Sequence, residues 1–357
     1  PVWSACRPNA RSLAVSQGKG LDDIAAQVSA IMESIEGFHA EQIDQPIRHA
    51  SEQQMRAVRQ VVDVARLPRT ARPFDTQRPI FWIEARDLTA AAPVWIPFEL
   101  VHLNYTLPPL PGSGLFVASS NGLASGNHRF EAMSHALCEV IERDASTLWA
   151  CSSEARQHRQ RLNLASVDDE ACGSVLERFA RADLAVAVWD ITSDVDVPAF
   201  SCAIADRVHN PMRPLTVARG MGCHPAREVA LLRALTEAAQ SRLTVISGSR
   251  DDLSDARYDR TPDEAEQFRR RLNDTPCPRD FRSIVSHDGA CIDDDVAVEL
   301  AALRAAGADQ VLIVDLTRAD FRIPVVRVLV PGLEALHDTP GFTPGPRARA
   351  RLAEACP

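Results

Sequence analysis

Several long stretches of the chain place apolar residues three and four positions apart, the spacing that predicts amphipathic helices. Helices are predicted over 22–41, 129–150, 167–182, 226–246 and 293–306. Asp22 and Asp23 stand at the start of the first stretch, where the positive end of the helix dipole favours acidic side chains.

Shorter runs rich in β-branched and aromatic residues predict strands. These runs are 80–85, 94–100, 184–190, 199–205, 215–220, 311–315 and 324–330, and 2–14 is also predicted to be extended. A glycine-bracketed turn is predicted at 17–20, loops at 66–79, 108–114 and 119–127, a charged and partly irregular stretch at 247–282, and an irregular Pro/Arg tail.

Strands and helices alternate only irregularly along the chain, which favours an α+β fold with mixed sheets flanked by helices over a doubly wound parallel sheet. No internal repeat and no break in composition stand out, so a single domain is expected over 1–357. Because Pro1 is not a natural first residue, a further segment is expected upstream of it.

The bulk composition is that of a globular protein, with 357 residues, 45% hydrophobic, 24% charged and a net charge of −9. The acidic balance argues against nucleic acid or an anionic membrane as a partner, because both need a basic surface. No run approaches the about 18 apolar residues of a membrane helix. Nine cysteines without a C-x-x-C motif indicate neither a zinc site nor a disulfide framework, so a reducing cytoplasm is expected.

One residue count is unusual. Lys19 is the only lysine among 39 basic residues, as if a GC-rich genome had replaced lysine by arginine everywhere else. A lysine that persists against such a drift calls for a specific reason.

The chemistry is carried by polar faces on three otherwise apolar helices. The positions that share a face are Ser29, Glu33 and Glu36 in the first helix, Glu131, Glu139, Glu142 and Arg143 in the second, and Arg233, Glu237 and Gln240 in the third. The plain interpretation is that these faces are solvated, as in most amphipathic helices. The flanking residues are so apolar, however, that buried helices are also expected, and buried charges need partners.

The Glu-x-x-Glu spacing occurs twice, at Glu33/Glu36 and at Glu139/Glu142. Carboxylates three positions apart on a buried helix repel each other unless cations lie between them, and Mg²⁺ prefers carboxylate and phosphate oxygens. The sequence therefore supports the hypothesis of a Mg²⁺–nucleotide site built from helix faces. Neither a P-loop nor a G-x-G-x-x-G fingerprint is present, so the turn around Lys19 and the loop 121–127 are the candidate phosphate contacts.

Other catalytic chemistries find little support. The chain has no G-x-S-x-G elbow and no H-E-x-x-H motif. His128 and His135 lie seven positions apart without an evident third ligand, so structural roles are expected for both.

At this point the sequence resembles the YcaO family in four ordered blocks that span nearly the whole chain. The blocks are GKGLDDIAAQVSAIMESIEGFHAE (18–41), SSNGLASGNHRFEAMSHALCEVIERDA (119–145), RGMGCHPAREVALLRALTEAAQSRLTVISGSRDDL (219–253) and IPVVRVLVPGLE (323–334). The resemblance implies the α+β fold of the family and ATP- and Mg²⁺-dependent activation of a peptide backbone amide. The family phosphorylates the amide oxygen and expels phosphate after a nucleophile attacks the amide carbon.

The resemblance also implies roles for individual residues. Glu33, Glu36, Glu139 and Glu142 match the Mg²⁺–phosphate ligands of the family. Arg143 and Lys19 are the expected catalytic residues. The positions expected to line the nucleotide are Ser29, Asn127, Glu131, Arg233, Glu237 and Gln240. For Gln240 and Arg327 a structural role is equally expected.

The end of the chain differs from that of azoline-forming members, which carry a Pro-x-Pro-x-Pro tail where this sequence reads FTPGPR (342–347). This difference favours a stand-alone or TfuA-associated enzyme that makes a thioamide in a ribosomally made precursor peptide. A cyclodehydratase that forms azolines from Cys, Ser or Thr is the enzymatic alternative, and a non-catalytic scaffold that binds a peptide or partner is the alternative of another class. The expected partners are the precursor peptide, a TfuA-like or leader-binding protein, and a second copy of the chain if the enzyme is a homodimer.

Overall fold

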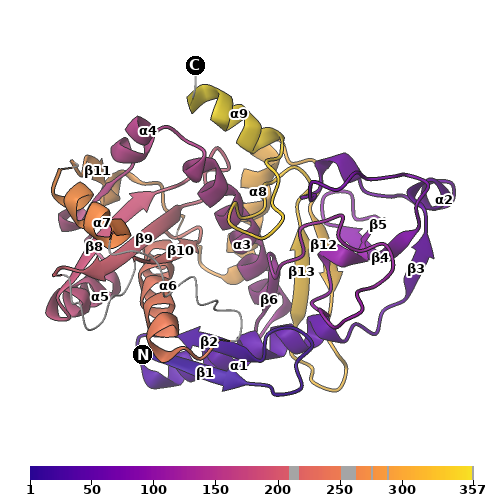
Figure 1. Ribbon diagram of the computed structural model, residues 1–357, viewed down its shortest axis with the longest axis horizontal. Helices are drawn as coiled ribbons and strands as arrows, with labels where there is room; N and C mark the ends of the chain where they lie inside the picture. The colour runs from indigo at the N-terminus through magenta and orange to yellow at the C-terminus, as the bar shows by residue number, and fades with distance from the viewer. Residues whose placement is uncertain (209–216, 251–262, 275, 288, 356–357) are drawn as a thin grey trace. The chain divides into compact units, whose positions relative to one another are not determined.

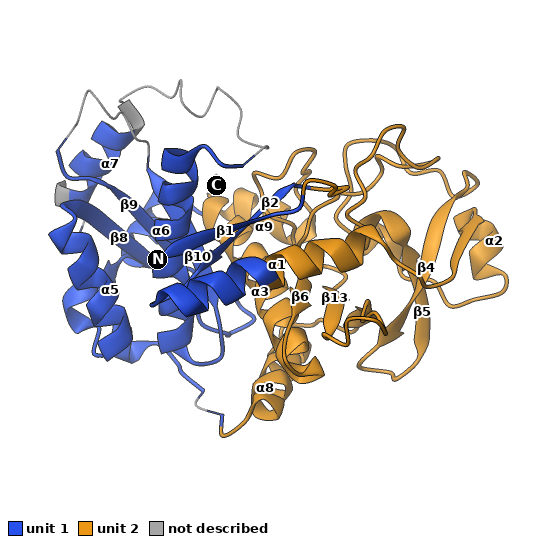
Figure 2. Ribbon diagram, turned by 90° about the horizontal axis from the view of Figure 1, so that it is seen from below, with its two compact units in different colours: residues 1–7, 13–31, 152–289 blue, residues 8–12, 32–151, 290–357 orange. Residues whose placement is uncertain are grey.

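The computed structural model describes residues 1–208, 217–250, 263–274, 276–287 and 289–355 (Figure 1). The chain divides into two compact units, each assembled from separated segments (Figure 2). Unit 1 comprises residues 1–7, 13–31 and 152–289, and unit 2 comprises 8–12, 32–151 and 290–357. Helix α1 (Asp23–Glu41) contributes its first part to unit 1 and its second part to unit 2. The single domain expected from the sequence stays a prediction.

Unit 2 is built on a six-stranded antiparallel sheet. The order is β3 (Ile47–Ala50), β4 (Ile80–Asp87), β12 (Leu312–Asp315), β13 (Val325–Leu329) and β6 (Leu123–Ser125), and β5 (Pro93–Pro97) also pairs with β4. Helix α3 (Arg129–Ala150) packs on β13 and β6, and α8 (Ile292–Ala305) and α9 (Pro346–Ala355) pack on α3. The short helix α2 (Glu52–Arg56) begins with Ser51, whose side chain caps it.

Unit 1 contains a three-stranded antiparallel sheet in the order β10 (Ala218–Cys223), β9 (Ala199–Asp206) and β8 (Leu184–Asp190). Alternate residues of β9 enter two different core clusters, Cys202 and Ile204 with helix α6 (Arg227–Ser247), and Ala203 and Ala205 with helix α7 (Asp263–Asp274). Because successive strand residues point to opposite faces, α6 and α7 cover opposite faces of this sheet.

Further elements complete unit 1. They are the hairpin of β1 (Val2–Cys6) and β2 (Val15–Lys19), helices α4 (Glu154–Arg159) and α5 (Glu170–Arg181), and a short parallel pair of β7 (Leu162–Asn163) with β11 (Arg279–Asp280). That pair is the only parallel one among the named strands of the described residues, which confirms an α+β rather than a doubly wound fold.

The predicted long helices are confirmed, but several local predictions are wrong. Residues 17–19 belong to strand β2 instead of a turn, because β1 pairs with them. The strand predicted over 94–100 ends at Pro97, where a 3₁₀ turn begins. Strand β10 begins at Ala218 and ends at Cys223, three residues later than predicted, and 215–216 lie outside the described residues.

Regular structure also extends into segments that the sequence assigned to loops. The predicted loop 119–127 contains the short strand β6, because β13 pairs with it. The stretch 247–282 holds α7 and β11, while its residues 251–262 and 275 are not described. The C-terminal tail forms α9 as far as Ala355. Within the part of the chain that is described, no helix is long and apolar enough to cross a membrane.

Candidate functional site

Glu36 is a half-buried member of a carboxylate cluster in unit 2. It lies on α1, and its Oε1 accepts hydrogen bonds from Ser125 N–H at 2.9 Å and Ser125 Oγ–H at 2.6 Å. The pKa of Glu36 is raised to about 8, mainly by burial and to a smaller extent by the negative charges of Glu33 and Glu139, against the lowering effect of Ser125. The predicted pairs on two helices, Glu33/Glu36 and Glu139/Glu142, therefore contribute to one electrostatically coupled group.

Arg143 lies beside the second carboxylate pair. Its Nη2 lies 3.6 Å from Glu139 Oε1 and its Nη1 lies 3.6 Å from Glu142 Oε1. Carboxylate oxygens are the donors that Mg²⁺ prefers, so the residues present fit this ion chemically. Among the described side chains, however, no three metal-binding groups stand in ligating positions.

Asn127 and Glu131 are brought together at the start of α3. The Asn127 N–H donates to Glu131 Oε2 at 2.8 Å, and the Asn127 side-chain amide donates to the same oxygen at 3.2 Å. His128 is the N-cap of α3, and its Nδ1 accepts a hydrogen bond from Phe130 N–H at 3.3 Å. The structural role expected for His128 is therefore confirmed.

A second polar cluster lies in unit 1 around Lys19. The Lys19 Nζ donates to Glu237 Oε2 at 2.9 Å, and Lys19 N–H donates to Ser29 Oγ at 3.3 Å. The other oxygen of Glu237 accepts a hydrogen bond from Met221 N–H at 3.2 Å. The structure thus brings the three predicted residues Lys19, Ser29 and Glu237 together.

Arg233 and Gln240 both donate to backbone carbonyls of unit 1. Arg233 Nη1–H donates to Cys223 O at 3.0 Å. The side-chain amide of Gln240 donates to Gln17 O, and the Gln17 side chain in turn accepts a hydrogen bond from Thr244 Oγ1–H. Gln240 therefore links β2 to α6, which is a structural role, and its assignment to the nucleotide stays a prediction.

The three helices α1, α3 and α6 share a short pattern of apolar and acidic positions. Residues 30–36 of α1 read AIMESIE, residues 136–142 of α3 read ALCEVIE, and residues 234–240 of α6 read ALTEAAQ. Glu237 thus corresponds to Glu33 and Glu139, whereas Gln240 stands where the other two helices have a glutamate.

Glycine contacts support this pattern. A Cβ added at Gly18 would lie 2.2 Å from Ala26 O and 2.0 Å from Ala30 N of α1. A Cβ added at Gly222 would lie 2.1 and 2.5 Å from the corresponding atoms of α6, the oxygen of Ala230 and the nitrogen of Ala234. Only glycine allows a strand to approach a helix backbone so closely. The third helix lacks this contact, because Ala124 stands where the other two have glycine; Gly126 instead corresponds to Gly20, and Cβ atoms added at these two glycines would lie 2.7 Å from Ala132 N and 2.6 Å from Ala26 N.

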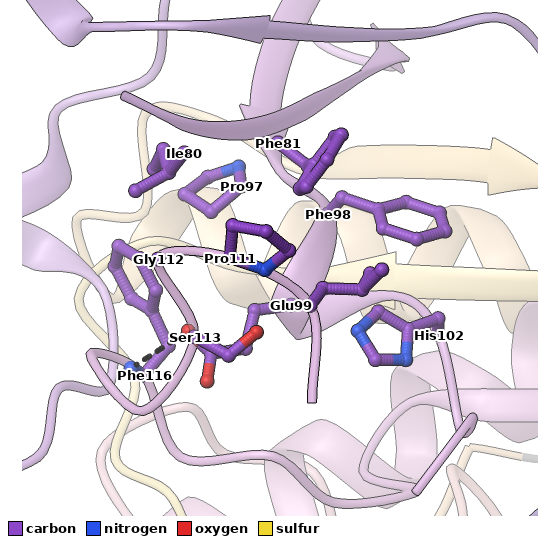
Figure 3. Close-up of a pocket in the computed structure, with 11 residues that line it drawn as sticks. Ile80, Phe81, Pro97, Phe98, Glu99, His102, Pro111, Gly112, Ser113 and Phe116 are labelled. Carbon is purple, nitrogen blue, oxygen red and sulfur yellow. Dashed lines mark hydrogen bonds between the residues drawn. The ribbon is translucent and has the colours of Figure 1, made fainter. Parts of the chain in front are cut away.

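A shallow pocket lies elsewhere in unit 2. Figure 3 shows Glu99 and His102 beside the rings of Phe98 and Phe116 and the proline Pro111. The Glu99 carboxylate accepts hydrogen bonds from the N–H groups of residues 114–116, so it stabilises the adjacent loop. None of the residues predicted for the nucleotide or metal lines this pocket.

Arg327 and His102 have polar atoms that no described residue satisfies. Arg327 lies on β13, is 3% exposed, and has no hydrogen-bond partner for its Nε or Nη1. His102 was missed by the sequence reasoning, and its buried Nε2 also has no partner. Arg327 could be singled out because it is a lone arginine within the apolar run VVRVLV (325–330). Nothing in the local sequence distinguished His102.

Comparisons with known proteins agree with these observations. Residues 17–334 match the family described as YcaO cyclodehydratase, ATP- and Mg²⁺-binding. A protein of the tfuA 3′ region of Rhizobium leguminosarum bv. trifolii is 38% identical over 342 residues, which cover 94% of this chain and 80% of that protein.

Two solved structures have a similar fold. YcaO from Methanopyrus kandleri, bound with AMPPCP and Mg²⁺, is 25% identical with a TM-score of 0.74, and the match covers 97% of this chain and 88% of that one. A heterocyclase in complex with substrate and cofactor has the same TM-score of 0.74 at 23% identity, and the match covers 93% of this chain but only 46% of the heterocyclase. The chain therefore belongs to the YcaO family and is an ATP-dependent, peptide-backbone-modifying enzyme whose cofactors are ATP and Mg²⁺.

Proposed function

We propose that this enzyme phosphorylates a backbone amide oxygen of a ribosomally made precursor peptide and forms a thioamide. The similarity to a protein encoded next to tfuA supports the thioamide product and a TfuA-like partner. A reducing cytoplasm, where ATP and nascent peptides meet, is the proposed compartment.

The coupled carboxylates of unit 2 carry this proposal. Glu33, Glu36, Glu139 and Glu142 would hold Mg²⁺, because a bound cation would favour the ionised form of Glu36 against the burial, and the smaller repulsion by Glu33 and Glu139, that raise its pKa. Bound Mg²⁺ neutralises phosphate charge during transfer. Arg143, beside Glu139 and Glu142, adds a fixed positive charge next to the same oxygens. Nucleotide contacts by Lys19, Ser29, Asn127, Glu131, Arg233, Glu237 and Gln240 remain predictions.

The chemistry follows from the weakness of an amide oxygen as a leaving group. ATP transfers its terminal phosphoryl group to that oxygen and leaves as ADP. A sulfide-level nucleophile then adds to the amide carbon, and the C–O bond breaks with release of phosphate as the C=S bond forms. The enzyme contributes mainly positioning and charge neutralisation.

A cyclodehydratase is the second candidate, because the family model carries that description and a heterocyclase shares the fold. In that reaction a Cys, Ser or Thr side chain of the peptide is the nucleophile, and water is lost overall. The two products differ in mass in opposite directions, since exchange of oxygen for sulfur adds mass and dehydration removes it.

The decisive experiment is mass spectrometry of the precursor peptide encoded beside this gene, after co-expression with the enzyme and the TfuA-like protein. We expect a gain in mass that matches replacement of oxygen by sulfur. A loss of water would assign the cyclodehydratase, and an unmodified peptide without ATP turnover would assign the scaffold.

Glu139→Gln is the variant that tests the metal assignment. Loss of a residue that only orients a metal ligand typically weakens metal binding about 10-fold. Glu139→Gln removes a proposed ligand itself, so it should weaken Mg²⁺-dependent ATP binding by more than that. Glu299→Gln is the matched control, since Glu299 is a fully buried carboxyl group of unit 2 outside the cluster. Titration of ATP with and without Mg²⁺ measures the effect. Unchanged Mg²⁺-dependent affinity in Glu139→Gln would refute the assignment.

A further inference from the structure

Arg327 is a buried cation whose hydrogen-bonding capacity is mostly unused. Its neighbours on β13, Val326 and Val328, are fully buried. Only Nη2 has a partner among the described residues, donating to Ser119 O at 2.6 Å, whereas Nε and Nη1 have none. Guanidinium groups in protein interiors are normally paired with carboxylates or phosphates. A buried arginine without such a partner indicates an absent ligand.

His102 adds a second unused donor near Arg327. Its Nδ1 accepts a hydrogen bond from Asn104 N–H at 3.1 Å, so the ring proton lies on Nε2, the buried atom that lacks a partner. The pKa of His102 is lowered to about 4, mainly by burial and to a smaller extent by the charge of Arg327. The imidazole is therefore neutral at pH 7 and presents Nε2–H as a donor.

Glu139 is close enough to act on Arg327 electrostatically. Burial lowers the pKa of Arg327 to about 10, although the charge of Glu139 opposes this effect. Glu139 nevertheless leaves Nε and Nη1 without a hydrogen bond. A ligand that meets these unused donors must accept hydrogen bonds and suit a positive environment, which describes an anionic oxygen.

We propose that Arg327, with the Nε2–H of His102, binds an oxygen of the phosphoryl group that passes from ATP to the peptide amide. The proposal rests on the proposed function, because that function assigns Mg²⁺ to the neighbouring Glu139. The guanidinium and the imidazole are rigid donors already in place before the reaction, so they need no reorganisation when charge develops on the phosphoryl oxygens. Arg327 is thus a substrate-contacting residue of the reaction.

Arg327→Met is the primary test, with thermal unfolding of the ligand-free protein as the first measurement. Because the variant removes a buried cation without an ionic partner, we expect its melting temperature to rise. Arg347→Met is the matched control. Arg347 Nη2 lies 2.9 Å from Asp144 Oδ2, and the side chain of Asp144 is fully buried, so this variant should melt at a lower temperature. A lower melting temperature for Arg327→Met as well would assign Arg327 a structural role and overturn the proposal.

Inorganic phosphate and ATP–Mg²⁺ are the probes for the second measurement. Phosphate should raise the melting temperature of the wild type and of Arg347→Met but not of Arg327→Met. Peptide-dependent ATP turnover should fall about 100-fold in Arg327→Met, the usual cost of one preorganised donor, and Arg327→Lys should restore part of it. Unchanged turnover, or an unchanged response to phosphate, in Arg327→Met would contradict the proposal.

Two further comparisons are informative. The first separates the nucleotide from the phosphorylated peptide as the source of the oxygen, and the second separates failure of the proposed function from failure of the anion site. Weaker binding of ATP–Mg²⁺ to Arg327→Met in the absence of peptide assigns the oxygen to the nucleotide. Unchanged binding of ATP–Mg²⁺ together with lost turnover assigns the oxygen to the phosphorylated peptide. If the wild type modifies no peptide, the proposed function fails. Loss of the phosphate response in Arg327→Met would still support the anion site in that case.

Discussion

Lys19 combines a compact ammonium with a close fit of the surrounding backbone. Its Nζ lies 2.9 Å from Glu237 Oε2, and its side chain is 26% exposed. An ion pair that is partly exposed in this way contributes only about 0–1 kcal/mol to stability. The free energy of folding therefore gives little reason for this single lysine to persist.

We expect Lys19→Arg to reduce ATP turnover at least about 10-fold while the melting temperature changes little, because a planar guanidinium cannot take the place of a compact ammonium. Steady-state turnover with precursor peptide and a thermal melt measure the two quantities. Lys19→Met is the companion variant that removes the charge altogether. Wild-type turnover in Lys19→Arg would leave codon drift as the explanation of the lone lysine.

The glutamates of the carboxylate cluster could be predicted from the sequence, but the residues that contact them could not. Helical spacing alone places Glu33 with Glu36 and Glu139 with Glu142, because residues three positions apart share a helix face. Ser125, which donates two hydrogen bonds to Glu36, lies 89 positions away along the chain. Such contacts depend on strand pairing across the sheet, which no local pattern reports.

At the scale of elements, the close approach of β2 to α1 depends on Gly18. Gly18→Ala should destabilise the protein by about 3 kcal/mol, since the added methyl group would overlap backbone atoms of α1 that cannot move independently. Gly173→Ala in α5 is the matched control, because an added Cβ there meets no atom within 4 Å. That variant should gain about 0.5–1 kcal/mol from higher helix propensity.

Urea unfolding of both variants beside the wild type measures these differences. Equal stability of the two alanine variants would show that β2 can move away from α1 at no cost. The same substitution at Gly222 should resemble Gly18→Ala, because its contacts with α6 repeat those of Gly18 with α1.

Long elements were predictable because their own periodicity specifies them, whereas short ones depend on partners. Helices α1, α3 and α6 follow their apolar spacing closely. Strand β2 was predicted as a turn since its glycines favour one locally, and the antiparallel pairing of Val2 with Lys19 decides otherwise. Strand β6, of three residues, likewise exists because β13 pairs with it.

At the scale of the whole molecule, the pH dependence of stability should include a term from Glu299 on α8. Its Oε1 accepts hydrogen bonds from Ser134 Oγ–H at 2.7 Å and Cys138 Sγ–H at 3.1 Å, and burial raises its pKa to about 11. At pH 7 the carboxyl group is protonated in the folded protein and ionised in the unfolded chain. Its contribution to stability is therefore full below about pH 4.5 and is lost as the pH rises towards 11.

Glu299→Gln should remove this dependence, because glutamine has no proton to release. As the pH rises near neutrality, the free energy of unfolding of the wild type should fall relative to that of the variant by about 1.4 kcal/mol per pH unit. Urea unfolding at several pH values measures it. Parallel pH profiles for the two proteins would show that Glu299 is ionised in the fold.

The fold class was predictable from the irregular order of strands and helices, but the division into two units was not. Each unit gathers segments from distant parts of the chain, so no change in composition marks a boundary. The common pattern of α1, α3 and α6 is weak in the sequence alone, because only four of its seven positions stay similar in all three helices. Matching glycine contacts made it recognisable.

The lone lysine has a consequence for chemical labelling. A reagent that acylates amines can modify only one side chain, that of Lys19, besides the terminal amine of the chain. Because its Nζ is engaged by Glu237 and partly exposed, the rate of acylation reports on the environment of that one amine. The protein therefore carries a built-in, single-position probe that needs no engineered cysteine.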